Sequence, residues 1–111
     1  MSLVVRFVAP ALVDIIDILQ WSEAKFGAAA RGRYEALIGL AAQQIAADPT
    51  AVPAHERPEI SPGLWSLHLR SVAGGEVDDP PHLVFYRFDV THLRVVRVLH
   101  EARDLTTELR A

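Results

Sequence analysis

The side chains with the clearest potential for chemistry are basic residues carried within a β-rich stretch from Pro81 to Leu105. Strand patterns at His82–Asp89 and Leu93–Leu99 run there into a short polar segment that begins at His100. Arginines and histidines are interspersed among the apolar residues of both predicted strands. A purely structural hairpin has no need of these positive charges, so we expect them to contact a ligand or a partner.

Period-two alternation separates the two faces of the predicted sheet. We expect the face toward the helices to carry Trp65, Leu67, Leu69, Val84, Tyr86, Phe88, Val96 and Val98. We expect the opposite, open face to carry His68, Arg70, Phe85, Arg87, Val95, Arg97 and Leu99. That second set mixes positive and apolar side chains, so it suits an acidic amphipathic segment of a partner protein or a phosphate backbone. By the same alternation Arg94 does not share the open face with Arg87 and Arg97, and it lies near a turn.

Several of these residues also have a purely structural interpretation. An arginine on a strand is commonly solvated or paired across strands. A lone histidine where a strand meets a helix, such as His100, is commonly a local hydrogen-bonding residue, although an ordinary pKa of about 6.5 leaves it available for proton transfer. Arg103 and Asp104 are expected to form a local ion pair.

Other polar and aromatic residues are expected to have no functional role. Asp14 and Asp17 fall on the polar face of a predicted helix, where solvation is the simplest interpretation. Trp21 and Trp65 are expected in the core or at its edge. We expect no cofactor, because the chain shows neither a His/Cys cluster with metal spacing nor a glycine-rich phosphate loop.

The helices and strands that must position these residues are predicted from the apolar periodicity and from the glycines and prolines that end each element. Two amphipathic helices are expected on either side of Gly27, joined so closely that they form an antiparallel hairpin. A proline-containing surface connection follows. The remaining expected elements are an opening strand at Leu3–Val8, a strand at Trp65–Arg70, an acidic turn at Gly74–Pro81, the two strands above, and a closing helix at Glu101–Arg110.

This order, β-α-α-β-β-β-α, predicts an α+β fold over residues 1–111 as a single domain. We expect a mainly antiparallel sheet with the helical hairpin packed on one face. The formal net charge of −3 does not favour a general grip on nucleic acid, and no direct sequence-specific nucleic-acid binding by this chain alone is expected. The absence of cysteine and of long apolar runs predicts a cytoplasmic protein without membrane contact.

The order of elements is accompanied by several short strings: Phe26-Gly27, Tyr34, Gly63-Leu64, His82-Leu83-Val84-Phe85-Tyr86-Arg87, and Arg97-Val98-Leu99-His100-Glu101-Ala102-Arg103-Asp104. In these features the chain resembles the ParE branch of the RelE/ParE toxins of bacterial type II toxin–antitoxin systems. The resemblance covers nearly the whole chain. Two features depart from the family pattern: the Gly74–Pro81 hairpin is longer and more acidic, and Trp65 occupies a position where an arginine is common.

The resemblance implies a toxin that causes growth arrest, serves plasmid or chromosomal stability, and is neutralised by a ParD-like antitoxin in a hetero-oligomer. ParE-branch members are associated with inhibition of DNA gyrase, so gyrase is the expected target. We expect the antitoxin or the target to contact His68, Arg70, Phe85, Arg87, Arg97, Leu105 and Leu109.

Two alternatives remain open from the sequence. RelE-like relatives cut messenger RNA on the ribosome, and Arg70, Arg87, Arg97 and His100 would be the catalytic set in that case. Lys25 is the only lysine, and no tyrosine lies near His100, so this set is reduced. The other alternative is a protein of this fold that has lost toxicity and persists as a component of a complex.

Overall fold

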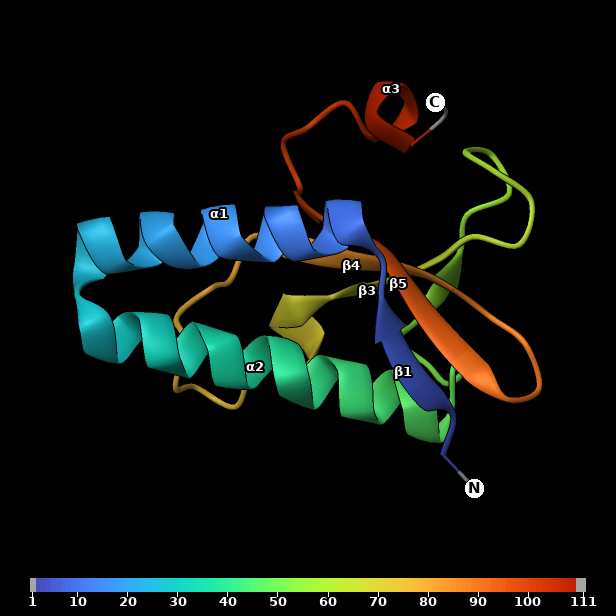
Figure 1. The fold of residues 1–111 in the computed structure, drawn as a ribbon, viewed down its shortest axis with the longest axis horizontal. Coiled ribbons are helices and arrows are strands. Elements are labelled where there is room, and N and C mark those ends of the chain that lie inside the picture. The colour runs from blue at the N-terminus through green and yellow to red at the C-terminus, as the bar shows by residue number, and fades with distance from the viewer. Residues whose placement is uncertain (1, 110–111) are drawn as a thin grey trace.

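The computed structural model describes residues 2–109 and has the predicted α+β architecture (Figure 1). The elements are β1 (Val4–Phe7), α1 (Ala9–Phe26), α2 (Ala28–Ala47), β2 (His55–Glu56), β3 (Trp65–His68), the 3₁₀ turn η1 (Leu69–Ser71), β4 (His82–Phe88), β5 (His92–His100) and α3 (Leu105–Leu109). The sheet has the order β1-β5-β4-β3-β2. Only β1 runs parallel to its neighbour, and the other pairs are antiparallel.

The two long helices form the predicted antiparallel hairpin against one face of the sheet (Figure 1). Pro10 lies in the first turn of α1, where its missing N–H leaves no hydrogen bond unmade. Gly27 separates the helices with a φ of 94°, a conformation that glycine adopts without a steric penalty. The core between helices and sheet contains Leu19, Leu37, Ile38, Ala41, Ile45, Leu67, Val84, Tyr86, Leu93 and Val95, with others.

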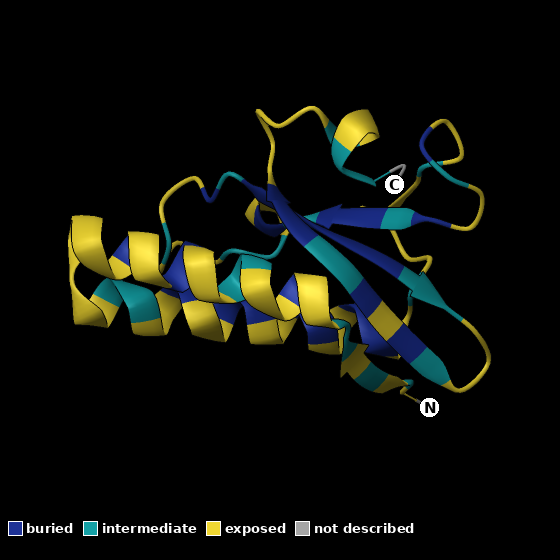
Figure 2. Cartoon of the chain, turned by 45° about the horizontal axis from the view of Figure 1, so that its top comes forward, coloured by how far each residue is buried: buried dark blue, intermediate teal, exposed yellow. Residues whose placement is uncertain are grey.

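The second face of the sheet is covered rather than open, which corrects our expectation. Phe85 has no exposed surface and lies in a second apolar cluster with Leu83, Leu99, Ile60 and Leu64. The segment before β3 and the closing helix α3 supply this cover, the latter through Leu105 and Leu109. Of the strands, β4 at the centre of the sheet is mostly buried (Figure 2), whereas β1 and β2 at its edges contain no buried residue.

A β-bulge changes the predicted division of the two faces in β5. Phe85 pairs with Arg97, but the next residue, Tyr86, pairs with Val95, so Val96 is left without an opposing residue. Val95 therefore packs toward the helices and Val96 toward α3, the reverse of the prediction. A single-residue insertion is invisible to an alternation pattern, because each strand segment on either side still alternates.

The element boundaries differ from the prediction at three places. The strand expected through Arg70 ends at His68 and continues as the η1 turn. The closing helix begins at Leu105, after a turn at residues 101–103, and its expected end at Arg110 lies outside the described residues. The proline-containing connection contains the two-residue strand β2, which pairs with β3.

One polar contact lies inside the helix-covered region. The hydroxyl of Tyr34 on α2 and Nδ1 of His82 on β4 are 2.5 Å apart, and both side chains are buried. Burial raises the pKa of Tyr34, with a further contribution from Glu101, so the tyrosine retains its proton and is assigned as the donor. Burial, assisted by His100 and His68, lowers the pKa of His82 to about 4. His82 is therefore neutral at neutral pH.

This burial predicts a pH dependence of stability. The unfolded chain binds a proton at His82 below its ordinary pKa of 6.5, whereas the folded chain resists protonation until about pH 4. The free energy of unfolding should therefore fall as the pH is lowered through this window. Urea unfolding of the His82→Gln variant should show a shallower fall than the parent protein, while a matched His55→Gln variant, at an exposed histidine, should keep the parental slope. Equal slopes for the parent and His82→Gln would contradict the assignment.

Candidate functional site: a basic surface held by local carboxylates

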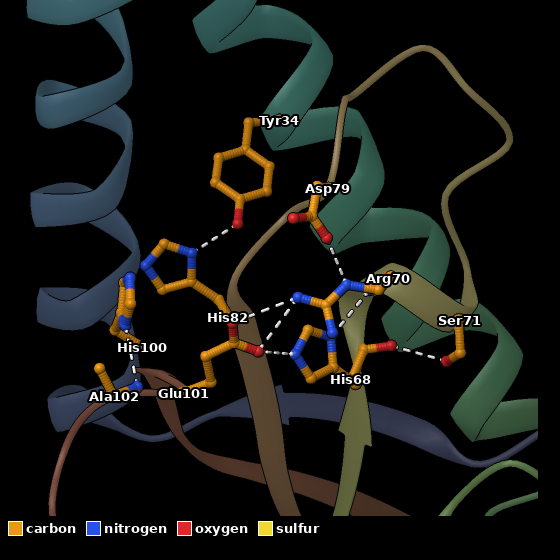
Figure 3. Close-up of polar contacts among 9 residues, drawn as sticks. All are labelled: Tyr34, His68, Arg70, Ser71, Asp79, His82, His100, Glu101 and Ala102. Atoms are coloured by element: carbon orange, nitrogen blue, oxygen red, sulfur yellow. Dashed lines mark hydrogen bonds and ion pairs between the residues drawn. The ribbon is translucent and has the colours of Figure 1, made fainter.

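Two of the predicted site residues, His68 and Arg70, belong to one polar network beside η1 (Figure 3). Arg70 donates from Nε to Asp79 and from Nη2 to Glu101, and Glu101 also lies 2.6 Å from Nε2 of His68. The hydrogen bond to Asp79 and the charge of Glu101 raise the pKa of Arg70, so the guanidinium stays charged. The structure thus brings His68 and Arg70 together, as predicted, but with two carboxylates that the sequence did not identify as partners.

Both ring nitrogens of His68 are engaged in this network. Nδ1 accepts the backbone N–H of Arg70 at 3.0 Å, which places the ring proton on Nε2. Nε2 then donates to Glu101, and this bond is the main reason that the pKa of Glu101 is lowered. A general base needs a free lone pair directed at the substrate, and His68 has none in this arrangement.

Arg87 lies elsewhere and holds a loop. Its Nη1 donates to the carbonyl oxygen of Pro62 and its Nη2 to the hydroxyl of Ser61, at 2.5 and 2.6 Å. The same loop passes Gly63, whose φ of 78° favours glycine. Arg87 therefore anchors the segment that covers Phe85, and it does not belong to the His68 network.

Arg97 is largely enclosed, with 23% of its side chain exposed. It makes a bidentate pair with Asp14 of α1, with Nε–Oδ2 and Nη2–Oδ1 distances of 2.7 and 2.9 Å. The same carboxylate accepts the backbone N–H of Val98, on the edge of β5 beyond the last residue paired with β1. Nη1 of Arg97 lies 3.5 Å from Glu108 of α3. Asp14 is thus not the solvated residue that we expected.

The remaining candidates have local structural contacts. Nδ1 of His100 accepts the backbone N–H of Ala102, which shapes the turn after β5. Arg103 pairs with Glu108 rather than with Asp104, and Asp104 instead accepts from Thr107 at the start of α3. The expected Arg103–Asp104 pair is therefore wrong.

The apolar members of the predicted site lie beneath or within α3. Leu105 and Leu109 are partly buried and pack on the cluster that contains Phe85. Phe85 itself is inaccessible in this conformation, so a partner reaches it only if α3 or the Ser61–Gly63 loop moves. Trp21, expected in the core or at its edge, is 43% exposed on α1, and its ring meets that of the buried His82 edge to face.

The arrangement supports binding better than acid–base chemistry. The arginines end in separate contacts, with Arg70 on Asp79 and Glu101, Arg87 on a loop, and Arg97 on Asp14. None of them is free to stabilise a developing phosphorane, which needs donors directed at one point. Within residues 2–109, no group of three His, Asp or Glu side chains is placed to hold a metal ion.

Sequence reasoning missed the acidic partners, which now define the site. Asp14, Asp79 and Glu101 come from α1, the loop before β4 and the turn after β5. Asp14 and Arg97 are separated by 83 residues, so no local spacing reveals their contact. A signal was present for Glu101, within the polar segment that begins at His100, and for Asp79, within the acidic turn at Gly74–Pro81.

The family of the chain follows from comparison with known proteins. Residues 5–105 match the family model described as ParE toxin of type II toxin-antitoxin system, parDE. The chain belongs to the ParE toxin family. The match begins within β1, spans both long helices and the other strands, and ends at the first residue of α3.

A solved structure has the same fold. A chain from the chromosomal ParDE TA system of P. aeruginosa is similar with a TM-score of 0.65 and 15% sequence identity, covering 89% of this chain and 96% of that one. At this identity the likeness concerns the fold alone. Among curated proteins there is no match. In the described part of the chain, no helix is long and apolar enough to cross a membrane.

The Asp14–Arg97 contact can be tested by substitution. Asp14→Ala leaves a mostly enclosed guanidinium and the Val98 N–H without their acceptor, so it should lower the free energy of unfolding by about 1–3 kcal/mol. Asp17→Ala, on the exposed side of the same helix, should change it by less than about 0.5 kcal/mol. Urea denaturation measures both. Equal effects of the two substitutions would show that the contact contributes nothing to stability.

Proposed function

We propose that this ParE-family protein is a toxin that inhibits DNA gyrase by binding, and that a ParD-like antitoxin neutralises it. The observation that carries the proposal is the family match across residues 5–105. The solved ParDE relative supports the same fold and, by its name, a two-component system. Gyrase as the target follows from the association of ParE-branch toxins with that enzyme.

The site geometry favours a binding inhibitor over a nuclease. In-line cleavage of RNA requires a base for the 2′-hydroxyl, an acid for the leaving oxygen and cations around the phosphate. Here Arg70, Arg87 and Arg97 are engaged by separate partners. Nδ1 of His100, the fourth residue of the alternative catalytic set, accepts the backbone N–H of Ala102. A binding surface needs none of these groups to be free for proton transfer.

A supercoiling assay tests the proposed target. Purified protein, shown to be folded by circular dichroism, should inhibit gyrase in a dose-dependent manner, and addition of the antitoxin should restore supercoiling. An unaffected gyrase would refute the proposal. If translated messages were then cut within codons, the ribonuclease alternative would hold, and if expression without the antitoxin caused no growth arrest, the protein would be a non-toxic component.

We place the antitoxin on the surface formed by His68, Arg70 and α3. Arg70 is 48% exposed and is held by two exposed carboxylates, so an incoming acidic side chain can replace one of them at little electrostatic cost. Leu105 and Leu109 pack on the Phe85 cluster, whose Leu83 pairs with His68 between β3 and β4. Apolar side chains of a partner can add to or displace this packing. Arg87 and Arg97 contribute by holding the surface in shape.

The Arg70→Ala substitution should weaken antitoxin binding, because it removes the exposed cation that pairs with an acidic residue of the partner. We expect roughly tenfold, or about 1.4 kcal/mol. Arg94→Ala is the matched control, since Arg94 is also 48% exposed and also pairs with one aspartate, but at the β4–β5 turn. Titration calorimetry with the purified antitoxin measures both. An Arg70→Ala affinity equal to that of Arg94→Ala would place the antitoxin elsewhere.

A further inference from the structure

A groove at the far end of the helical hairpin lies beside the surface described above and shares Asp79 with it. Its volume is about 450 Å³, within the range of small-molecule sites. The helices and the family-atypical Gly74–Pro81 loop form its walls. It is lined by Trp21, Ser22, Phe26, Ala30, Arg33, Tyr34 and residues 75–81.

One wall of the groove is aromatic and accessible. Trp21 and Phe26 are 43% and 66% exposed, and their rings meet edge to face with centroids 5.8 Å apart. Tyr34 closes the inner end, held by its hydrogen bond to His82. Exposed aromatic faces of this kind stack readily on a planar ligand.

The same wall carries positive charge that the protein does not use. Arg33 lines the groove and makes no ion pair within residues 2–109, whereas Arg31, two residues earlier, is paired with Glu23. Lys25 does not line the groove, and its Nζ lies over the Trp21 ring, 5.8 Å from the centroid. An anionic group bound beside the aromatic wall would therefore find in Arg33 a donor that need not break an ion pair.

The opposite wall is the acidic loop, and its carboxylates are mostly engaged. Glu76 accepts the backbone N–H of Gly74, and Asp79 accepts from Arg70. Asp78 is exposed, lines the groove, and makes no hydrogen bond within the described residues. It is available to accept from a hydroxyl or amino group of a ligand.

We propose that this groove binds a single nucleotide, with the base on Trp21 and Phe26, the phosphate at Arg33, and a sugar hydroxyl or base amino group at Asp78. A planar heterocycle, an anion and a hydrogen-bond donor are the features that match the aromatic, cationic and acidic walls together. A longer nucleic acid fits less well, because the acidic loop and the net charge of −3 repel a polyanion. Arg70, which is assigned to the antitoxin, does not line this groove.

Calorimetry with adenosine monophosphate, adenosine and inorganic phosphate tests the proposal on the full chain. The monophosphate should bind more tightly than adenosine, and phosphate alone should bind weakly or not at all. The two tryptophans also give separate indole N–H signals in nitrogen-15 spectra. The monophosphate should shift the signal of Trp21 and leave that of Trp65, on β3, in place.

Two surface variants and one control test which part of the ligand each wall of the groove contacts. Arg33→Gln should weaken the monophosphate by about tenfold and leave adenosine unchanged, because it removes only the phosphate contact. Trp21→Ala should weaken both ligands by about tenfold through lost stacking. Arg31→Gln is the control for the arginine and should alter neither, since Arg31 does not line the groove. Each variant is first shown to unfold at the parental urea midpoint.

Several results would overturn the proposal. These are no binding of the monophosphate at millimolar concentration, equal effects of Arg33→Gln and Arg31→Gln, a shift of the Trp65 signal instead of Trp21, or tighter binding of a short oligonucleotide than of the mononucleotide.

Discussion

The pairing of Arg97 with Asp14 is the contact on which the arrangement of this protein depends. It joins β5 to the start of α1, satisfies the Val98 N–H beyond the end of β1, and extends through Glu108 to α3. The helix hairpin on one face of the sheet and the short helix on the other are thereby tied to the same strand. An ion pair this enclosed is retained only with good geometry, which the bidentate contact supplies.

Other arginines near the sheet also join separate segments of the chain, although the net charge of the protein is negative. Arg87 holds the loop over Phe85, and Arg70 joins η1 to the turn after β5 through Glu101. These positive charges first organise the protein's own segments. What remains for a partner is the outer side of the Arg70 network and the apolar margin of α3, a surface suited to binding.

Much of the fold was predictable because its signals are local. Alternation identified the strands from Trp65 onward, helical periodicity gave both long helices, and Gly27 marked the turn between them. That the second face of the sheet is covered was not predictable. The cover depends on the path of the chain through a 3₁₀ turn, a bulge at Val96 and a five-residue helix, and none of these has a clear sequence pattern. The basic residues of the site were predictable, but their acidic partners were not. Asp14 has the sequence pattern of a solvent-exposed helix residue, and its contact with Arg97 arises only because α1 packs against β5.

Nuclear magnetic resonance of the arginine side chains tests most directly whether Arg97 is held as described. Its Nε–H should exchange with water much more slowly than that of Arg94, whose pair with Asp89 is exposed, because the bond to Asp14 protects it. The Asp14→Asn substitution should abolish the protection while the protein remains folded. An Arg97 Nε–H that exchanges as fast as that of Arg94 would contradict the account.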